Sequence, residues 1–171
     1  PSCDAGLVEV VSPSEQTVMS GVQMPIEVVL KNFGADTLTS ATINWSINGV
    51  NQTPYAWTGS LAENAFDTVQ IGTHSFSSGE ITLEANVVKA CDTINSNDTI
   101  TSNFSACIGN NNSVTTLTIS NTDATADYPS FTAAINALAA SGICGPVVFN
   151  VPSGTYQEQV NMPTIIGSSS T

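Results

Sequence analysis

The chain has 171 residues, of which 2 are basic and 14 are acidic, and its formal net charge at pH 7 is −12. It has too few lysine and arginine side chains to neutralise phosphates, which excludes nucleic acids and anionic membranes as expected partners. Only 9% of the residues are charged, and long soluble helices need more Glu, Lys and Arg than this. The composition therefore predicts a β-rich extracellular protein, and no segment reaches the roughly 20 apolar residues of a membrane-spanning helix.

Residues 1–107 predict an all-β domain of short strands separated by turn signals. The strands are expected at 6–13, 24–34, 41–49, 54–59, 66–72, 81–90 and 98–106. In the third of these, Ile43, Trp45 and Ile47 share one face, and the Asn48–Gly49 pair at its end is a strong hairpin signal. Seven short strands in this length are typical of an immunoglobulin-like sandwich, with Trp45 in its core.

The composition changes after a polar linker at 108–113. A strand at 114–120 is followed by a helix signal at 127–142, in which Phe131, Ile135 and Leu138 form one apolar stripe. Pro129 is expected at the first helical position and Gly142 just past the end of the helix.

Residues 114–171 cannot bury a core by themselves, because a solenoid rung buries its apolar face only against the next rung. They predict the helix-capped first coil of a parallel β-helix. Strands at 147–151 and 158–162 would then present an open apolar face. We expect the remainder of a larger polypeptide or a neighbouring subunit to cover that face.

Two segments of the sequence resemble known families. "VVLKNFGADTLTSATINWSING", "WTGSL" and "CDTINSNDT" resemble CARDB-like immunoglobulin-type modules. "DYPSFTAAINALAASGICGPVVFNVPSGTYQEQV" resembles the N-terminal cap and first coil of pectin-lyase-like right-handed β-helices. Together they are similar to large bacterial surface proteins exported by the type IX route, many of which are adhesins or filaments.

The resemblance implies an extracellular, non-catalytic module of a cell-surface protein that serves adhesion, spacing or filament assembly. Two alternatives are the N-terminal part of a polysaccharide-active β-helix enzyme and a carbohydrate-binding module. The chain itself has no Arg, and no Lys follows Lys89. It therefore lacks the later cations that a lyase of acidic polysaccharides uses to stabilise its intermediate, and no catalytic residue or cofactor is assigned.

Four cysteines suggest two disulfides in an exported chain. In an alternating seven-strand sandwich, Cys3 and Cys91 lie at one end and Cys107 lies at the other. This predicts a Cys3–Cys91 bond inside the sandwich and a Cys107–Cys144 bond between the two segments. The sequence has no CxxC spacing, which is the pattern that would indicate a zinc site.

Three further groups of residues are candidates for binding or chemistry. Asp92 and Asp98, in the loop "CDTINSND", are a weak calcium candidate, although such residues commonly cap turns. Tyr55 and Trp57 share a face of a short edge strand and form either a sugar-stacking platform or a cover for the sandwich edge. His74 is expected in a solvated loop, and Glu158 is expected to be structural because acid–base chemistry needs a second positioned group.

Asp-Thr followed by an aliphatic residue occurs four times and resembles a bacterial periplasmic O-glycosylation motif. The same triplet is also a natural turn-to-strand transition in a threonine-rich β-protein. The candidate threonines for covalent O-glycans are Thr37, Thr68, Thr93 and Thr99.

Overall fold

A computed structural model describes residues 1–109 and 113–168. The predicted linker therefore lies partly outside the described residues. The described chain forms two compact units. The first comprises Pro1–Gln16, Gln23–Ser75 and Glu80–Phe104, and the second comprises Thr17–Val22, Phe76–Gly79 and the residues from Ser105 onward.

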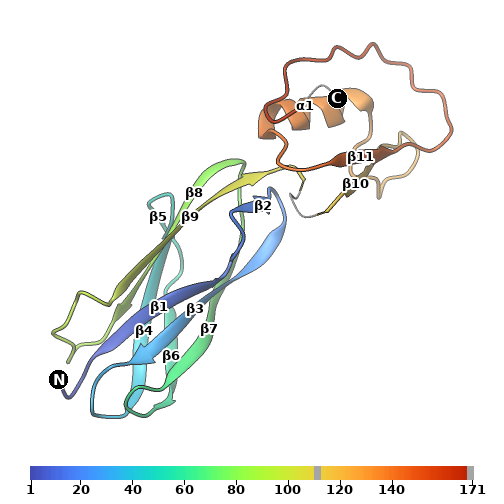
Figure 1. The fold of residues 1–171 in the computed structure, drawn as a ribbon. Coiled ribbons are helices and arrows are strands. Elements are labelled where there is room, and N and C mark those ends of the chain that lie inside the picture. The colour runs from blue at the N-terminus through green and yellow to red at the C-terminus, as the bar shows by residue number, and fades with distance from the viewer. Residues whose placement is uncertain (110–112, 169–171) are drawn as a thin grey trace. The chain divides into compact units, whose positions relative to one another are not determined.

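The first unit is a sandwich of two sheets (Figure 1). One sheet has the order β1-β3-β7, formed by β1 (Ala5–Ser12), β3 (Gln23–Asn32) and β7 (Phe66–Ser75). In the other sheet β9 (Thr99–Cys107) lies beside β8 (Gly79–Val88), and β8 pairs with β4 (Leu38–Ile47). Along its other side β4 pairs with β5 (Val50–Asn51) and β6 (Tyr55–Leu61).

Apolar side chains at alternate positions of the strands fill the space between the two sheets. In β3 the side chains of Ile26, Val28 and Leu30 are completely buried, and in β4 Ile43 is completely buried. Trp45 is 6% exposed, which confirms its predicted place in the core. Because successive side chains of a strand point to opposite faces, the same pattern sends the hydroxyl and amide side chains of β4 outward.

The seven expected strands are all present, as β1, β3, β4, β6, β7, β8 and β9. Asn48 and Gly49 have φ values of 49° and 78°, which are those of a type I′ turn and match the twist of the flanking strands. The two short strands β2 (Thr17–Met19) and β5 were not expected from the sequence. Each has too few residues to show a period of its own.

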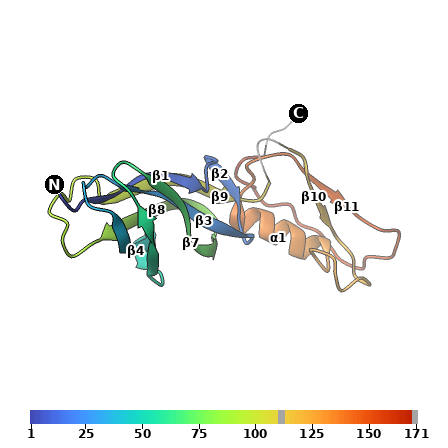
Figure 2. The same cartoon turned by 90° about the horizontal axis from the view of Figure 1, so that it is seen from below.

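The second unit is built around a parallel pair of strands, β10 (Thr115–Thr118) and β11 (Val147–Asn150), joined through helix α1 (Phe131–Ser141). The helix packs on this pair (Figures 1 and 2), and Leu138 joins Ile108 and Leu117 in a buried cluster. Strand β2 pairs in parallel with the last residues of β9, Ser105–Cys107. The other contributors to the cluster are half-buried: Met19, Tyr128, Ala137, Ile143, Val147, Phe149 and Ile165.

The helix begins later than the sequence suggested. Ser130 is the N-cap, and its hydroxyl accepts a hydrogen bond of 3.0 Å from the Ala133 N–H. Pro129 therefore precedes the N-cap and is not the first helical residue. Gly142, with a φ of 71°, ends the helix as predicted, and its N–H donates to the Leu138 carbonyl.

The strand expected at 158–162 is absent, and this prediction was wrong. Residues 151–165 have no regular secondary structure. No strand pairs with this segment among the described residues, and its Glu158 side chain binds the start of α1. Val148, Val160, Met162 and Ile166 are between 41% and 77% exposed.

The two disulfides have the pairing expected from the strand order. Cys3 bonds to Cys91 in the first unit, and Cys107 bonds to Cys144. Both members of the second pair belong to the second unit, so this bond does not join two domains as expected. The reason is that Ser105–Cys107, the last residues of β9, belong to the second unit together with their partner β2, and Ile108 then bridges to Ile143.

Candidate functional site

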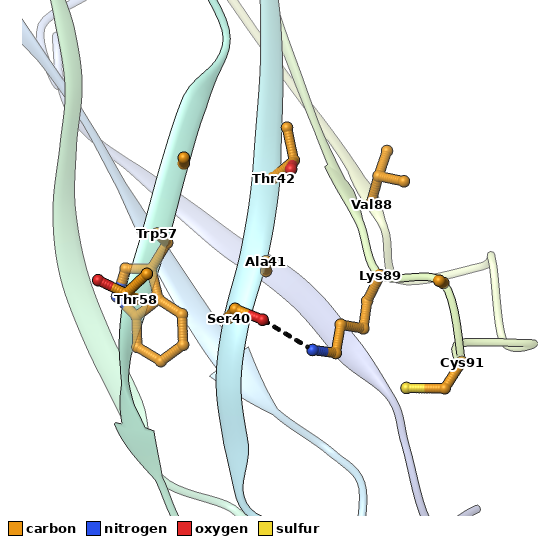
Figure 3. A pocket seen from close by; sticks show the side chains of 10 residues that line it. Ser40, Ala41, Thr42, Trp57, Thr58, Val88, Lys89 and Cys91 are labelled. Carbon is orange, nitrogen blue, oxygen red and sulfur yellow. Dashed lines mark hydrogen bonds between the residues drawn. The ribbon is translucent and has the colours of Figure 1, made fainter.

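A groove of about 480 Å³ lies on the outer face of β4, β6 and β8 in the first unit. Ser40 and Thr58 are paired across β4 and β6, and Thr42 lies between Ala56 of β6 and Val88 of β8. The hollow exists because the outward side chains at these positions are short (Figure 3). Its lining combines three hydroxyl groups with small apolar side chains, the Lys89 side chain and the buried Trp57.

Lys89 places an ammonium group in this groove. Its Nζ donates a hydrogen bond of 3.1 Å to the Ser40 hydroxyl (Figure 3), and the side chain is half-buried. Among the described residues, Lys89 forms no ion pair with a carboxylate. The only other lysine, Lys31, lies 4.5 Å from the ring centroid of Phe33, so the two cations have different environments.

The backbone that carries Lys89 is held at two points. Its carbonyl accepts a hydrogen bond of 2.9 Å from the Asp92 N–H, and Cys91 is bonded to Cys3. The ammonium group is thus presented from a short cross-linked segment directly after β8. This site has no local signature in the sequence, because its residues come from three separate strands. The available signal was that Lys89 is one of two basic residues in the chain.

The calcium candidate lies in a different part of the first unit. Both carboxylate oxygens of Asp92 accept backbone hydrogen bonds, from Ala5 at 2.7 Å and from Ile94 at 2.9 Å. Asp92 therefore does what the turn-capping interpretation expects. Asp98 lies close by, and its Oδ1 is buried without a partner among the described residues.

Burial raises the pKa of the Asp98 carboxyl, and the negative charges of Asp92 and Asp4 raise it further. Asn97 uses its amide to donate to Asp4 at 2.8 Å, while its own Oδ1 is buried and unpaired. Across the described residues, no group of three or more His, Cys, Asp or Glu side chains has an arrangement that could hold a metal ion.

The proposed sugar-stacking pair is not an exposed platform. Trp57 is 4% exposed, and its Nε1 donates a hydrogen bond of 2.9 Å to Asp67. Tyr55 is 36% exposed. Strand β6 is at the edge of its sheet, as predicted, but the indole ring covers the interior of the sandwich. The stacking interpretation was therefore wrong, and the edge-covering alternative is correct for Trp57.

The remaining candidates have structural surroundings. His74 lies in strand β7, not in a loop, and its ring is 6.3 Å from that of Trp45 in an edge-to-face arrangement. Glu158 accepts hydrogen bonds from the Phe131 and Thr132 N–H groups, both at 2.8 Å, and from the Thr132 hydroxyl. These bonds lower the pKa of the Glu158 carboxyl. It stabilises the start of α1.

The four threonines of the Asp-Thr triplets are all exposed: Thr37, Thr68, Thr93 and Thr99. All four lie on the surface of the first unit. The Thr99 hydroxyl also accepts a hydrogen bond of 2.9 Å from Asn86.

The fold of the first unit matches solved CARDB domains. A CARDB domain from Pyrococcus furiosus, whose crystal structure was determined in complex with di-metal ions, is 19% identical with a TM-score of 0.51. The match covers 63% of this chain and 96% of that chain. A domain of a Methanosarcina acetivorans protein, provisionally described as a cell surface protein, is 20% identical with a TM-score of 0.51. It covers 62% of this chain and 93% of that chain.

These similarities establish an immunoglobulin-like sandwich of the CARDB type for the first unit. No protein-family model matches the chain. No curated protein is significantly similar to it. In the part of the chain that the structure describes, no helix has both the length and the apolar character to cross a membrane.

Proposed function

We propose that the chain is a non-catalytic module of a secreted bacterial cell-surface protein, serving adhesion, spacing or filament assembly. The observation that carries this proposal is the CARDB-type sandwich, because one solved domain with this fold comes from a protein provisionally described as a cell surface protein. Two disulfides and a formal net charge of −12 are consistent with an oxidising extracellular setting.

The location is tested on intact cells that make the natural protein. An antibody against the sandwich is expected to label unpermeabilised cells, and brief treatment of those cells with an external protease should remove the label. An antibody against a cytoplasmic protein is the control for cell integrity. Labelling that requires permeabilisation would contradict the proposal.

The second unit is proposed to be the capped start of a β-helix. The support is that β10 and β11 run in parallel with the helix between them, and that Val148, Val160, Met162 and Ile166 are exposed. In a β-helix, a further parallel strand from a larger polypeptide would lie beside this pair and cover such side chains.

The mass of the protein isolated from its natural source tests both this proposal and O-glycosylation. The bare chain has a mass of 17.7 kDa. A larger mass is expected, and digestion would then separate added polypeptide from glycans on the four threonines. A monomer with the mass of the bare oxidised chain would contradict both additions.

A further inference from the structure

We propose that the groove on β4, β6 and β8 binds a carboxylate-bearing sugar, that is, a segment of a uronate-containing polysaccharide. This inference deepens the proposed surface function by assigning a ligand class to one face of the sandwich. The inference rests on the proposed function only in assuming that the chain meets this polysaccharide at a cell surface. Binding itself can be measured with the isolated chain.

The groove offers hydrogen-bond donors from Ser40 and Lys89. The Ser40 hydroxyl accepts its hydrogen bond from Lys89 Nζ at 3.1 Å, so its own proton is free to be donated. Two of the three ammonium protons are also available to a ligand. An ammonium and a hydroxyl that point into the same hollow are matched by the two oxygens of one carboxylate, and charge-assisted hydrogen bonds of this kind are the stronger ones.

The side chains that line the groove are arranged in two rows across the strands. The register pairs Thr58 with Ser40, which with Lys89 forms a row of polar groups. The neighbouring row is Ala56, Thr42 and Val88. Alternate residues of a strand are spaced about 7 Å apart, so the second row lies about one sugar ring from the first. A uronate can therefore place its carboxylate on Ser40 and Lys89 and its C–H face on Val88. A neighbouring sugar of the chain can lie on Ala56, which is two strand spacings of about 4.8 Å away from Val88.

The charges in and around the groove favour an anionic ligand. Lys89 has no carboxylate partner among the described residues of a chain with 14 acidic side chains. The groove lining contains no Asp or Glu. Two carboxylates near the lining are already engaged: Asp92 accepts hydrogen bonds from two backbone N–H groups, and Asp67 accepts one from the Trp57 indole. Charges farther away than about 8 Å are largely screened at physiological salt. The local cation then decides the preference for an anionic over a neutral sugar.

The size of the groove sets the length of ligand that it can hold. A volume of about 480 Å³ lies within the range of roughly 300–1,000 Å³ typical of small-molecule sites. It accommodates a short oligosaccharide segment. We therefore expect specific but weak binding of single oligomers, which a surface protein would strengthen through multivalency.

Binding is tested by calorimetry with the oxidised chain and two tetrasaccharides, tetragalacturonate and its carboxyl-reduced neutral counterpart. The acidic tetramer is expected to bind at least ten times more tightly than the neutral one. Lys89→Met keeps the aliphatic stem and removes the charge, and it should weaken acidic binding at least tenfold. Ser40→Ala removes the second donor and should also weaken it.

Lys31→Met is the matched control, because it changes the net charge by the same amount outside the groove. Its affinity should equal that of the original chain. Equal losses in the two lysine variants would indicate non-specific electrostatics and overturn the proposal. Absence of binding, equal affinity for both tetramers, or full affinity in Lys89→Met would also overturn it. Because these measurements use purified chain, they leave the cell-surface assignment to be judged separately by the labelling of intact cells.

Discussion

Removing the Cys107–Cys144 disulfide is expected to loosen the second unit while the sandwich stays folded. The perturbation is the double variant Cys107→Ala/Cys144→Ala, which avoids leaving one reactive thiol. Both cysteines belong to the second unit, and the bond holds the residues next to Ile108, a member of the buried cluster. The closed loop includes β10, α1 and the start of the segment that leads to β11.

The magnitude follows from the sequence separation of 37 residues. In the chain-entropy model, a loop of that size makes the cross-linked unfolded state less favourable by about 4 kcal/mol. Whole domains are stable by only about 5–15 kcal/mol. The loop that this bond closes contains Ile108, Leu117 and Leu138 of the buried cluster, and Ile119, Ala134 and Ile135 are also buried within it. Loss of the bond therefore removes a large share of what holds this unit folded.

Hydrogen exchange followed by mass spectrometry distinguishes the two units in one sample. Peptides from Thr115–Thr118 and Phe131–Ser141 should lose protection in the variant, and peptides from Gln23–Asn32 should keep it. The control double variant Cys3→Ala/Cys91→Ala should give the opposite pattern. If both double variants loosened the same peptides, or if the second unit kept its protection without its bond, the reasoning would be refuted.

Three other predictions concern polar side chains. Asn32 is 1% exposed; its amide donates to the Asp36 and Leu61 carbonyls, and its Oδ1 accepts from the Gly34 N–H. Asn32→Ala should therefore lower the free energy of unfolding, measured with a denaturant, by about 3 kcal/mol. The exposed control Asn44→Ala should lower it by less than about 0.5 kcal/mol. The lowered pKa of Glu158 means that its hydrogen bonds stabilise the fold above the unfolded-state pKa and are lost as the pH falls through the folded-state pKa. Glu158→Gln should reduce exchange protection of α1 at pH 7 and have little effect in strong acid, and an equal effect at both pH values would contradict this. The raised pKa of Asp98 has the opposite effect on stability, because the desolvated charge of its carboxylate destabilises the fold at pH 7. Asp98→Asn should raise the melting temperature at pH 7 but not in strong acid. A lower melting temperature of this variant at pH 7 would contradict this and show that the carboxylate has a favourable partner. Adding calcium to the original chain would then test whether that partner is a calcium ion.

The fold of the first unit could be read from the sequence to a large extent. The alternation over residues 41–47 of β4 and the Asn48–Gly49 pair are local signals, because a strand face and a type I′ turn depend on neighbouring residues. The cysteine pairing followed from strand direction alone. For Trp57 the sequence left two alternatives open, because its pattern is the same whether its ring covers the interior or faces a sugar. Its burial decides for the interior.

The sequence alone determined the strands of the sandwich, the helix, and the absence of a cationic surface, since these depend on composition and on periods of two or 3.6 residues. Only the tertiary structure decided that residues 158–162 form no strand, because a strand needs a backbone partner and none pairs with this segment among the described residues. The tertiary structure also placed Lys89 beside Ser40. Those two residues are 49 positions apart in the chain, and the pairing of β4 with β8 brings them together. Such a site has no local signature, because strand register is fixed by packing across the whole sheet.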